Sequence, residues 1–154
     1  MSQIVILCGG WGGLTCRDLP DSVIHIGSIS HERLFPRMAA VVHHVGAGTT
    51  AAALRAGVPS IIILVIGDQP FWGRRVHNLG TGPEPIPRKK LTAAALASAI
   101  NSVLDNRAML NRARDLGETL RIEDGISNAV KIIQYRLHHI NGDAGQCKMV
   151  KLGI

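Results

Sequence analysis

A glycine-rich loop that also carries an imidazole and two hydroxyl groups is the first place where this chain could do chemistry. Its residues are His44, Gly46, Ala47, Gly48, Thr49 and Thr50. The glycines let a ligand approach the backbone closely, and the loop's N–H groups open a short apolar helix, where free donors and the helix dipole attract phosphate. The His44 imidazole could donate a hydrogen bond to a diphosphate. The alternative is a tight strand-to-helix turn in which Thr49 caps the helix.

A carboxylate and an amide stand side by side after the next apolar run, as Asp68 and Gln69. This pair suits the vicinal hydroxyls of a hexose, because a carboxylate accepts hydrogen bonds while an amide both accepts and donates them. The alternative is that Asp68 caps the helix that starts at Pro70 and that Gln69 is solvated. Taken with the glycine-rich loop, the pair indicates a site for a sugar nucleotide.

The same glycines also match a dinucleotide-binding fingerprint, which is a competing interpretation. Gly46-x-Gly48-x-x-Ala51 has the required spacing, and Asp68 follows at about the 20-residue distance of the acidic residue that binds ribose. However, the intervening helix is short, and a new helix follows Asp68 at once. Because a lone glycine fingerprint is weak evidence, the sugar-nucleotide site is favoured.

Alternating strands and helices must position these loops. Apolar runs predict strands at residues 4–7, 21–26, 39–43 and 60–66. Helices are expected at 31–37, 49–56 and 70–79, the last ended by Gly80, then an extended connector at 82–87, a helix capped by Thr92, and helices at 107–120 and 126–138. This order predicts an α/β fold, a Rossmann-like parallel sheet with helices on both faces. Ligands of such sheets bind beyond the carboxyl ends of the strands, where both loops fall.

Composition places the chain among globular proteins. It has 154 residues, of which 46% are hydrophobic and 18% are charged. Residues 1–140 are expected to form one domain, and the polar, glycine-containing segment 141–154 a loose tail. Three cysteines lack metal-ligand spacing, and no second cluster accompanies His43 and His44, so no metal is expected.

The net charge of +6 would attract phosphate-bearing ligands and anionic membranes. Nucleic acid is not an expected partner, because Arg88-Lys89-Lys90 is the only basic run and no aromatic residues interleave with it. The longest apolar run, 61–66, is too short to span a bilayer, and the first residues lack signal-peptide features. A cytoplasmic protein is predicted, with peripheral contact to an anionic membrane left open.

Six motifs along the chain carry a resemblance to a known family. They are Gly10-Trp11-Gly12-Gly13-Leu14, Leu34-Phe35-Pro36, His43-His44-x-Gly46-Ala47-Gly48-Thr49-Thr50-Ala51-Ala52, Arg55-Ala56-Gly57-Val58-Pro59, Gly67-Asp68-Gln69-Pro70-Phe71-Trp72-Gly73 and Pro87-Arg88-Lys89-Lys90-Leu91. Together they resemble the C-terminal, donor-binding domain of the two-domain (GT-B) UDP-glycosyltransferases, in particular the sterol 3-beta-glucosyltransferase type and its bacterial natural-product relatives.

The resemblance implies roles for both loops. The diphosphate of a UDP-sugar would be held by His44, Gly46, Ala47, Gly48 and Thr49, and its hexose, expected to be glucose, by Asp68 and Gln69. The nucleobase and ribose would lie near the segment 30–34, which includes Arg33 and Leu34. A further glycine-rich loop, with Trp11 and Gly12, could close over the nucleotide. Val45 departs from the glycine of many relatives, and a β-branched residue tolerates fewer backbone angles.

The resemblance also implies a reaction without metal or other cofactor. A hexose would pass from UDP to a sterol or other lipid-like hydroxyl with inversion, while a histidine of the N-terminal domain deprotonates the acceptor. That domain and the first strand–helix unit of the donor domain are not expected in this chain, so no catalytic residue is predicted here. The alternatives are a non-catalytic UDP-sugar-binding subunit that needs a partner chain, and a truncated product without function.

Overall fold

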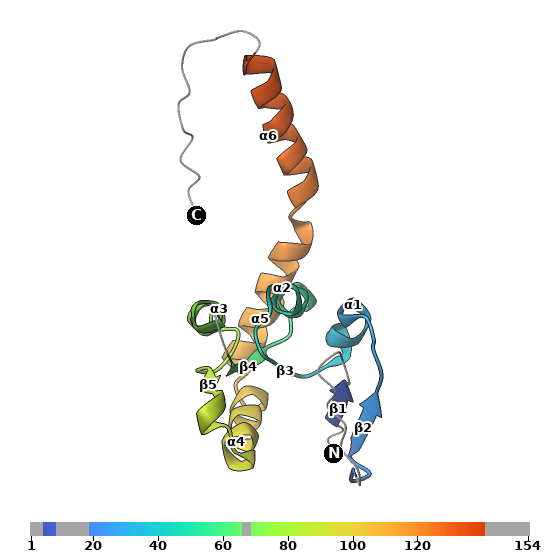
Figure 1. Ribbon diagram of the computed structural model, residues 1–154, viewed down its shortest axis with the longest axis vertical. Coiled ribbons are helices and arrows are strands. Elements are labelled where there is room, and N and C mark those ends of the chain that lie inside the picture. The colour runs from blue at the N-terminus through green and yellow to red at the C-terminus, as the bar shows by residue number, and fades with distance from the viewer. Residues whose placement is uncertain (1–4, 9–18, 66–68, 141–154) are drawn as a thin grey trace. The chain divides into compact units, whose positions relative to one another are not determined.

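The structure is a computed structural model that describes residues 5–8, 19–65 and 69–140 of the chain. The chain divides into two compact units, residues 1–120 and 121–154. Strands and helices alternate in the first unit, as the sequence predicted (Figure 1). The predicted division between a domain at 1–140 and a tail at 141–154 stays a prediction, because the tail lies outside the described residues.

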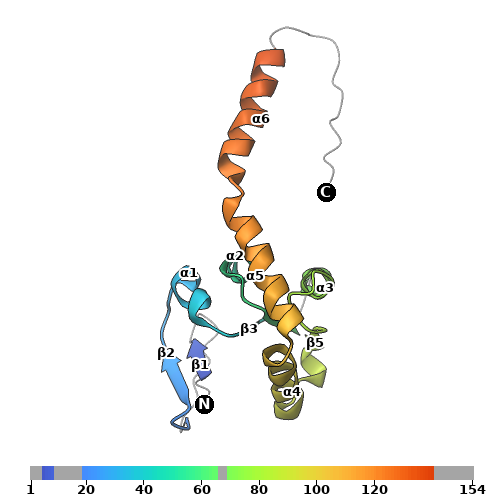
Figure 2. The same ribbon diagram turned by 180° about the vertical axis from the view of Figure 1, so that it is seen from behind.

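A pair of parallel strands comes first, followed by a short helical segment. β1 (Val5–Cys8) pairs with β2 (Val23–Ile26), and the two strands lie side by side in both views (Figure 1, Figure 2). α1 (His31–Leu34) continues into the 3-10 helix η1 (Phe35–Arg37). The predicted strands and helical turns are therefore present, with ends that differ by one or two residues.

A second parallel sheet has the strand order β3-β4-β5. It contains β3 (Val41–His43), β4 (Ser60–Leu64) and β5 (Ile86–Pro87). The first four residues of β4 are buried, as expected for a central strand covered on both faces. β5 falls where the sequence predicted only an extended connector. It is two residues long and includes Pro87, which cannot donate to the ladder, and a pairing of this kind is confined to a sheet edge.

Glycines end the helices that follow β3 and β4. α2 (Ala47–Ala56) stops at Gly57 and α3 (Gln69–Asn78) stops just before Gly80, and these glycines have φ angles of 73° and 70°. At each end the glycine N–H and the following N–H bond back to carbonyls of the last helical turn, which is the Schellman arrangement. The predicted stop at Gly80 is confirmed. Both turns direct the chain back toward the sheet.

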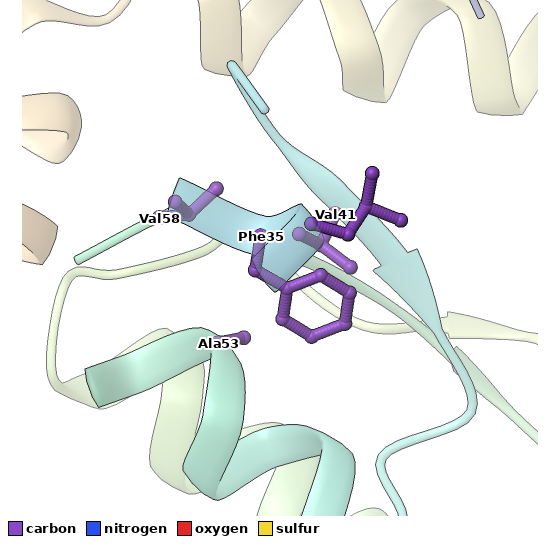
Figure 3. Packing of buried hydrophobic residues seen from close by; sticks show 5 residues of the cluster. Phe35, Val41, Ala53 and Val58 are labelled. Carbon is purple, nitrogen blue, oxygen red and sulfur yellow. The ribbon is translucent and has the colours of Figure 1, made fainter. Parts of the chain in front are cut away.

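The buried core of the first unit joins α1, η1, β3 and α2 (Figure 3). Phe35, Val41, Ala53 and Val58 pack together with Leu34, and each has 8% or less of its surface exposed. Aliphatic side chains dominate this cluster, because aromatic residues make up 3% of the chain. The packing fixes β3 against α2, and with them the loop that joins the two elements.

A contact between two glycines joins the end of α2 to α5 (Arg107–Ile122). A Cβ atom added at Gly117 would lie 2.6 Å from Gly57 Cα and 2.9 Å from the Leu54 carbonyl oxygen. The two backbones therefore touch directly. Nearby, Arg55 Nη1 donates a hydrogen bond of 3.0 Å to the Leu120 carbonyl oxygen.

Two further helices complete the described chain. In α4 (Ala93–Leu104), the Thr92 hydroxyl accepts a hydrogen bond of 3.1 Å from the Ala95 N–H, which confirms the predicted cap. α6 (Gly125–Ile140) belongs to the second unit. No helix in the described ranges is long and apolar enough to cross a membrane. Four apolar side chains at helical spacing along α6 are 45–81% exposed: Ile126, Val130, Ile133 and Leu137.

Candidate functional site

The turn from β3 into α2 places two neighbouring histidines in opposite environments. Side chains alternate between the interior and solvent along this segment: His43 and Val45 are buried, and His44 between them is exposed. This is the period of two expected of an extended chain. Of the two imidazoles, His44 is therefore the one that is accessible from outside, and its contact with a diphosphate stays a prediction.

Val45 has a backbone conformation that a β-branched residue rarely adopts. Its φ angle is +58°, the only positive value for a non-glycine residue in the described chain. Such a conformation costs about 1–3 kcal/mol and persists where the surroundings determine it. Here the side chain is 1% exposed and packs with Ile62 of β4 and Val76 of α3. This packing holds Val45 in its unfavourable backbone conformation.

His43 fixes the same turn from inside. Its Nδ1 accepts a hydrogen bond of 3.1 Å from the Val45 N–H, so the proton of the neutral ring lies on Nε2. That buried Nε2 has no hydrogen-bond partner among the described residues. Burial, reinforced by the nearby His44 and His31, lowers the pKa of His43 from 6.5 to about 4. The ring is thus neutral at physiological pH.

Backbone donors open the helix that follows. Gly46 is the N-cap, and the Thr50 N–H donates to its carbonyl oxygen at 2.9 Å, so the N–H groups of Ala47, Gly48 and Thr49 have no acceptor within α2. A Cβ atom added at Gly48 would have no neighbour within 4 Å, and one at Gly46 would lie 3.5 Å from His44 Nε2. Three N–H donors that have no acceptor within α2 therefore lie at one helix end. The exposed His44 imidazole and the open space beside Gly48 lie there as well.

Two details of this loop differ from the sequence-based expectations. The helix begins at Ala47, two residues before the predicted start, so the alternative in which Thr49 is the N-cap is wrong. The Thr50 hydroxyl is buried and donates to the Gly46 carbonyl oxygen at 2.9 Å, so it stabilises the helix start and is not directed toward a ligand. Gly46 has no side chain that could cap α2, so it supplies no acceptor to the N–H groups of the first helical turn.

The loop after β4 is closed by Gln69. The side chain is 9% exposed, and its Oε1 accepts a hydrogen bond of 2.5 Å from the Val65 N–H. The amide therefore ties the end of β4 to the start of α3, a role that the sequence did not predict. Asp68, the predicted partner of Gln69 in sugar binding, lies outside the described residues.

The sheet places the ends of the two strands that precede these loops at one edge. β3 and β4 are adjacent and parallel, and His43 is in register with Ile62. Their carboxyl ends therefore point the same way, and the shared cluster of Val45, Ile62 and Val76 packs the two strand ends against α3. This is the edge at which open α/β sheets bind ligands.

The other predicted site residues lie on α1 or outside the described residues. Arg33 is exposed on α1, whereas the Leu34 side chain is 8% exposed and belongs to the hydrophobic core, so Leu34 contributes packing. His31 stacks on Phe35 with ring centroids 4.6 Å apart. Trp11 and Gly12 lie outside the described residues. Within the described ranges, no three His, Cys, Asp or Glu side chains form a group that could hold a metal.

Sequence comparison matches most of this chain to a known family. The pattern of the family described as "Erythromycin biosynthesis protein CIII-like, C-terminal domain" matches residues 2–128. A sterol 3-beta-glucosyltransferase of Arabidopsis thaliana is 46% identical over 127 residues, which are 82% of this chain and 20% of that protein. The O-mycaminosyltylonolide 6-deoxyallosyltransferase of Streptomyces fradiae is 41% identical over 130 residues, 84% of this chain and 30% of that protein. The chain thus spans less than a third of these relatives.

Solved structures share the fold. The glycosyltransferase of kitacinnamycin superposes with a TM-score of 0.75 at 23% identity, covering 86% of this chain and 35% of that one. The glycosyltransferase VinC, solved in complex with DTDP, gives a TM-score of 0.69 at 23% identity and covers 79% of this chain and 31% of that one. The predicted α/β fold, with the parallel sheet of a GT-B glycosyltransferase, is confirmed.

Proposed function

We propose, from the premise that this chain belongs to the family of erythromycin biosynthesis protein CIII-like C-terminal domains, that it binds the nucleotide-sugar donor of a glycosyltransferase. The family is enzymatic, and its relatives include named sterol glucosyltransferases. The observation that carries the proposal is the start of α2. There the free N–H groups of residues 47–49 and the exposed His44 imidazole surround the open space beside Gly48.

The chemistry of this helix end suits a diphosphate. Backbone N–H groups and the positive end of the helix dipole favour negative charge without a metal ion. His44 adds an exposed side-chain donor at the same helix end. In a transfer reaction these groups would stabilise the negative charge that develops on the leaving nucleoside diphosphate. The residues assigned to the diphosphate are His44, Gly46, Ala47, Gly48 and Thr49.

The proposed donor is UDP-glucose, and the proposed acceptor is a sterol or other lipid-like hydroxyl. The sterol 3-beta-glucosyltransferases among the relatives support both assignments. Asp68 and Gln69 would bind the hexose, with Gln69 also closing its loop through Val65. The net charge of +6 suits peripheral contact with an anionic membrane in which such an acceptor dissolves. The competing dinucleotide interpretation receives no support from the family match.

Titration of the chain with UDP and with UDP-glucose tests the proposal. His44→Ala should weaken UDP binding by about tenfold or more, because a hydrogen bond to a charged group contributes about 1.5–3 kcal/mol. Asp68→Ala should leave UDP affinity unchanged and weaken only the additional affinity for UDP-glucose. Isothermal calorimetry measures both. His25→Ala, at an exposed position of β2, is the matched control. If both site variants bound UDP-glucose as the parent does, the site assignment would be wrong.

A further inference from the structure

The buried His43 has features that packing alone does not require. An imidazole that lay in a core only to fill space would have both nitrogens satisfied or would be replaced by an apolar side chain. In this chain the ring is 9% exposed, Nδ1 accepts from the Val45 N–H, and Nε2 lacks a partner among the described residues. In the described structure, the ring therefore uses only its acceptor nitrogen, Nδ1.

His43 accepts its hydrogen bond from Val45, the residue with the unfavourable backbone conformation. Val45 is at φ +58°, and its N–H donates to Nδ1 of the residue two positions earlier in the chain. The next residues are Gly46, the N-cap of α2, and the three free N–H donors. His44 lies in the chain between the two residues that this hydrogen bond joins. The bond therefore restrains the direction in which the His44 side chain faces.

We propose that His43 is a positioning residue for the donor diphosphate, which acts through the Nδ1-to-Val45 hydrogen bond to hold His44 and the first turn of α2 in a binding-ready arrangement. The inference rests on the proposed function, since the diphosphate is its ligand. His43 touches no ligand in this account. It sets the geometry of the turn, and the orientation of the neighbouring imidazole follows from that geometry.

Two substitutions separate the nitrogens of the ring. His43→Asn keeps an acceptor where Nδ1 lies, because the amide oxygen is attached to the same carbon position, and it removes the Nε2 end. His43→Gln keeps a polar group near Nε2 and removes the Nδ1 acceptor. UDP affinity is measured by calorimetry for each variant, with His25→Asn as an exposed control, and urea denaturation gives the folded fraction.

The expected result is asymmetric. His43→Asn should bind UDP within about threefold of the parent, whereas His43→Gln should bind about tenfold or more weakly when corrected for folded protein. A reversed order would mean that Nε2 contacts the ligand directly and would overturn the proposal. Equal, parent-like affinity in both folded variants would reduce His43 to a packing residue.

A second readout does not depend on UDP, and its first part uses the parent chain alone. Nitrogen-15 spectra of the parent chain should show His43 as the tautomer with an unprotonated Nδ1, and a proton on Nδ1 would overturn the proposal. The amide signals of Ala47 and Gly48 should keep their positions in His43→Asn and move in His43→Gln, in the absence of any ligand. If the parent did not bind UDP, the proposed function would fail, while these spectra would still decide whether His43 sets the turn.

Discussion

Adjacent histidines in this protein differ in what they can do because the extended chain alternates its side chains. His44 is exposed beside the free donors of α2, and His43 is buried with a pKa near 4. The sequence presents them as a pair, and only the observed alternation assigns one to the ligand side and one to the interior. Val45 is also in the core, and its packing there balances its unfavourable, left-handed φ angle.

The buried state of His43 makes the stability of the fold depend on pH. The unfolded chain binds a proton at this residue near pH 6.5, but the folded chain does so only near pH 4, because burial disfavours the charged ring. The unfolded state therefore binds more protons between these values, and the free energy of unfolding falls as the pH is lowered through this window. At about 1.4 kcal/mol per pKa unit, the loss amounts to about 3 kcal/mol.

Urea denaturation of the parent and of His43→Asn, from neutral pH down to about pH 4, measures this contribution. The parent should lose stability over the window, and the variant should lose markedly less. The exposed His25→Asn should keep the parent's pH dependence. Parallel curves for the parent and His43→Asn would show that this residue does not carry the effect.

The candidate residues could be found from the sequence where a residue type itself implies a chemistry. Glycines before a short helix and an accompanying histidine predicted a loop suited to phosphate, and in the structure the N–H groups of residues 47–49 have no acceptor within α2. The roles of Thr50 and Gln69 could not be predicted, because each depends on a backbone partner supplied by the fold: the Gly46 carbonyl and the Val65 N–H.

At the scale of elements, glycine governs how closely helices and loops approach. Gly57 ends α2 in a left-handed conformation, and Gly117 of α5 lies against its backbone. Periodicity and end signals were sufficient to predict the helices and four of the strands. They missed β5, which is defined by its pairing with β4 and has no apolar alternation of its own.

Gly117→Ala should destabilise the first unit. The new Cβ would lie 2.6 Å from Gly57 Cα and 2.7 Å from its nitrogen, and backbone atoms cannot rotate away as a side chain can. The expected loss in the free energy of unfolding is about 1–3 kcal/mol, the usual cost of overpacking. Gly125→Ala, where the added atom would have no neighbour within 4 Å, should be neutral or slightly stabilising. Equal stabilities in thermal denaturation would contradict the observed contact.

At the scale of the whole molecule, this chain covers one part of a larger enzyme's length. The residues that match the Arabidopsis sterol glucosyltransferase make up 20% of that protein. The sequence predicted a donor site without a general base, and the groups described at that place are backbone N–H donors and an exposed imidazole. Exposed apolar side chains recur at helical spacing along α6, and a sequence pattern of this kind does not say what covers them.

We expect the 154-residue chain to bind UDP without transferring glucose to a sterol by itself. A base must remove the acceptor proton during transfer, and general bases typically contribute about 10²–10⁴-fold to the rate. Release of UDP from UDP-glucose, measured with a sterol present, should stay at the level of hydrolysis. Turnover at an ordinary enzymatic rate would show that this chain holds the base. A stably co-purifying partner that restores transfer would favour the subunit alternative.

The aromatic pair at the start of α3 includes a tryptophan, which gives this protein an intrinsic fluorescence signal although it has few aromatic residues. Trp72 is 38% exposed and meets Phe71 edge-on, with ring centroids 5.3 Å apart, within one helical turn of Gln69. The chain contains two tryptophans, so replacing Trp11 by phenylalanine would leave Trp72 as the sole indole fluorophore. Its emission responds to the polarity around it, and a ligand settling beyond β4 would change that polarity. Ligand binding at the site could thus be followed by the intrinsic fluorescence of Trp72, without any label.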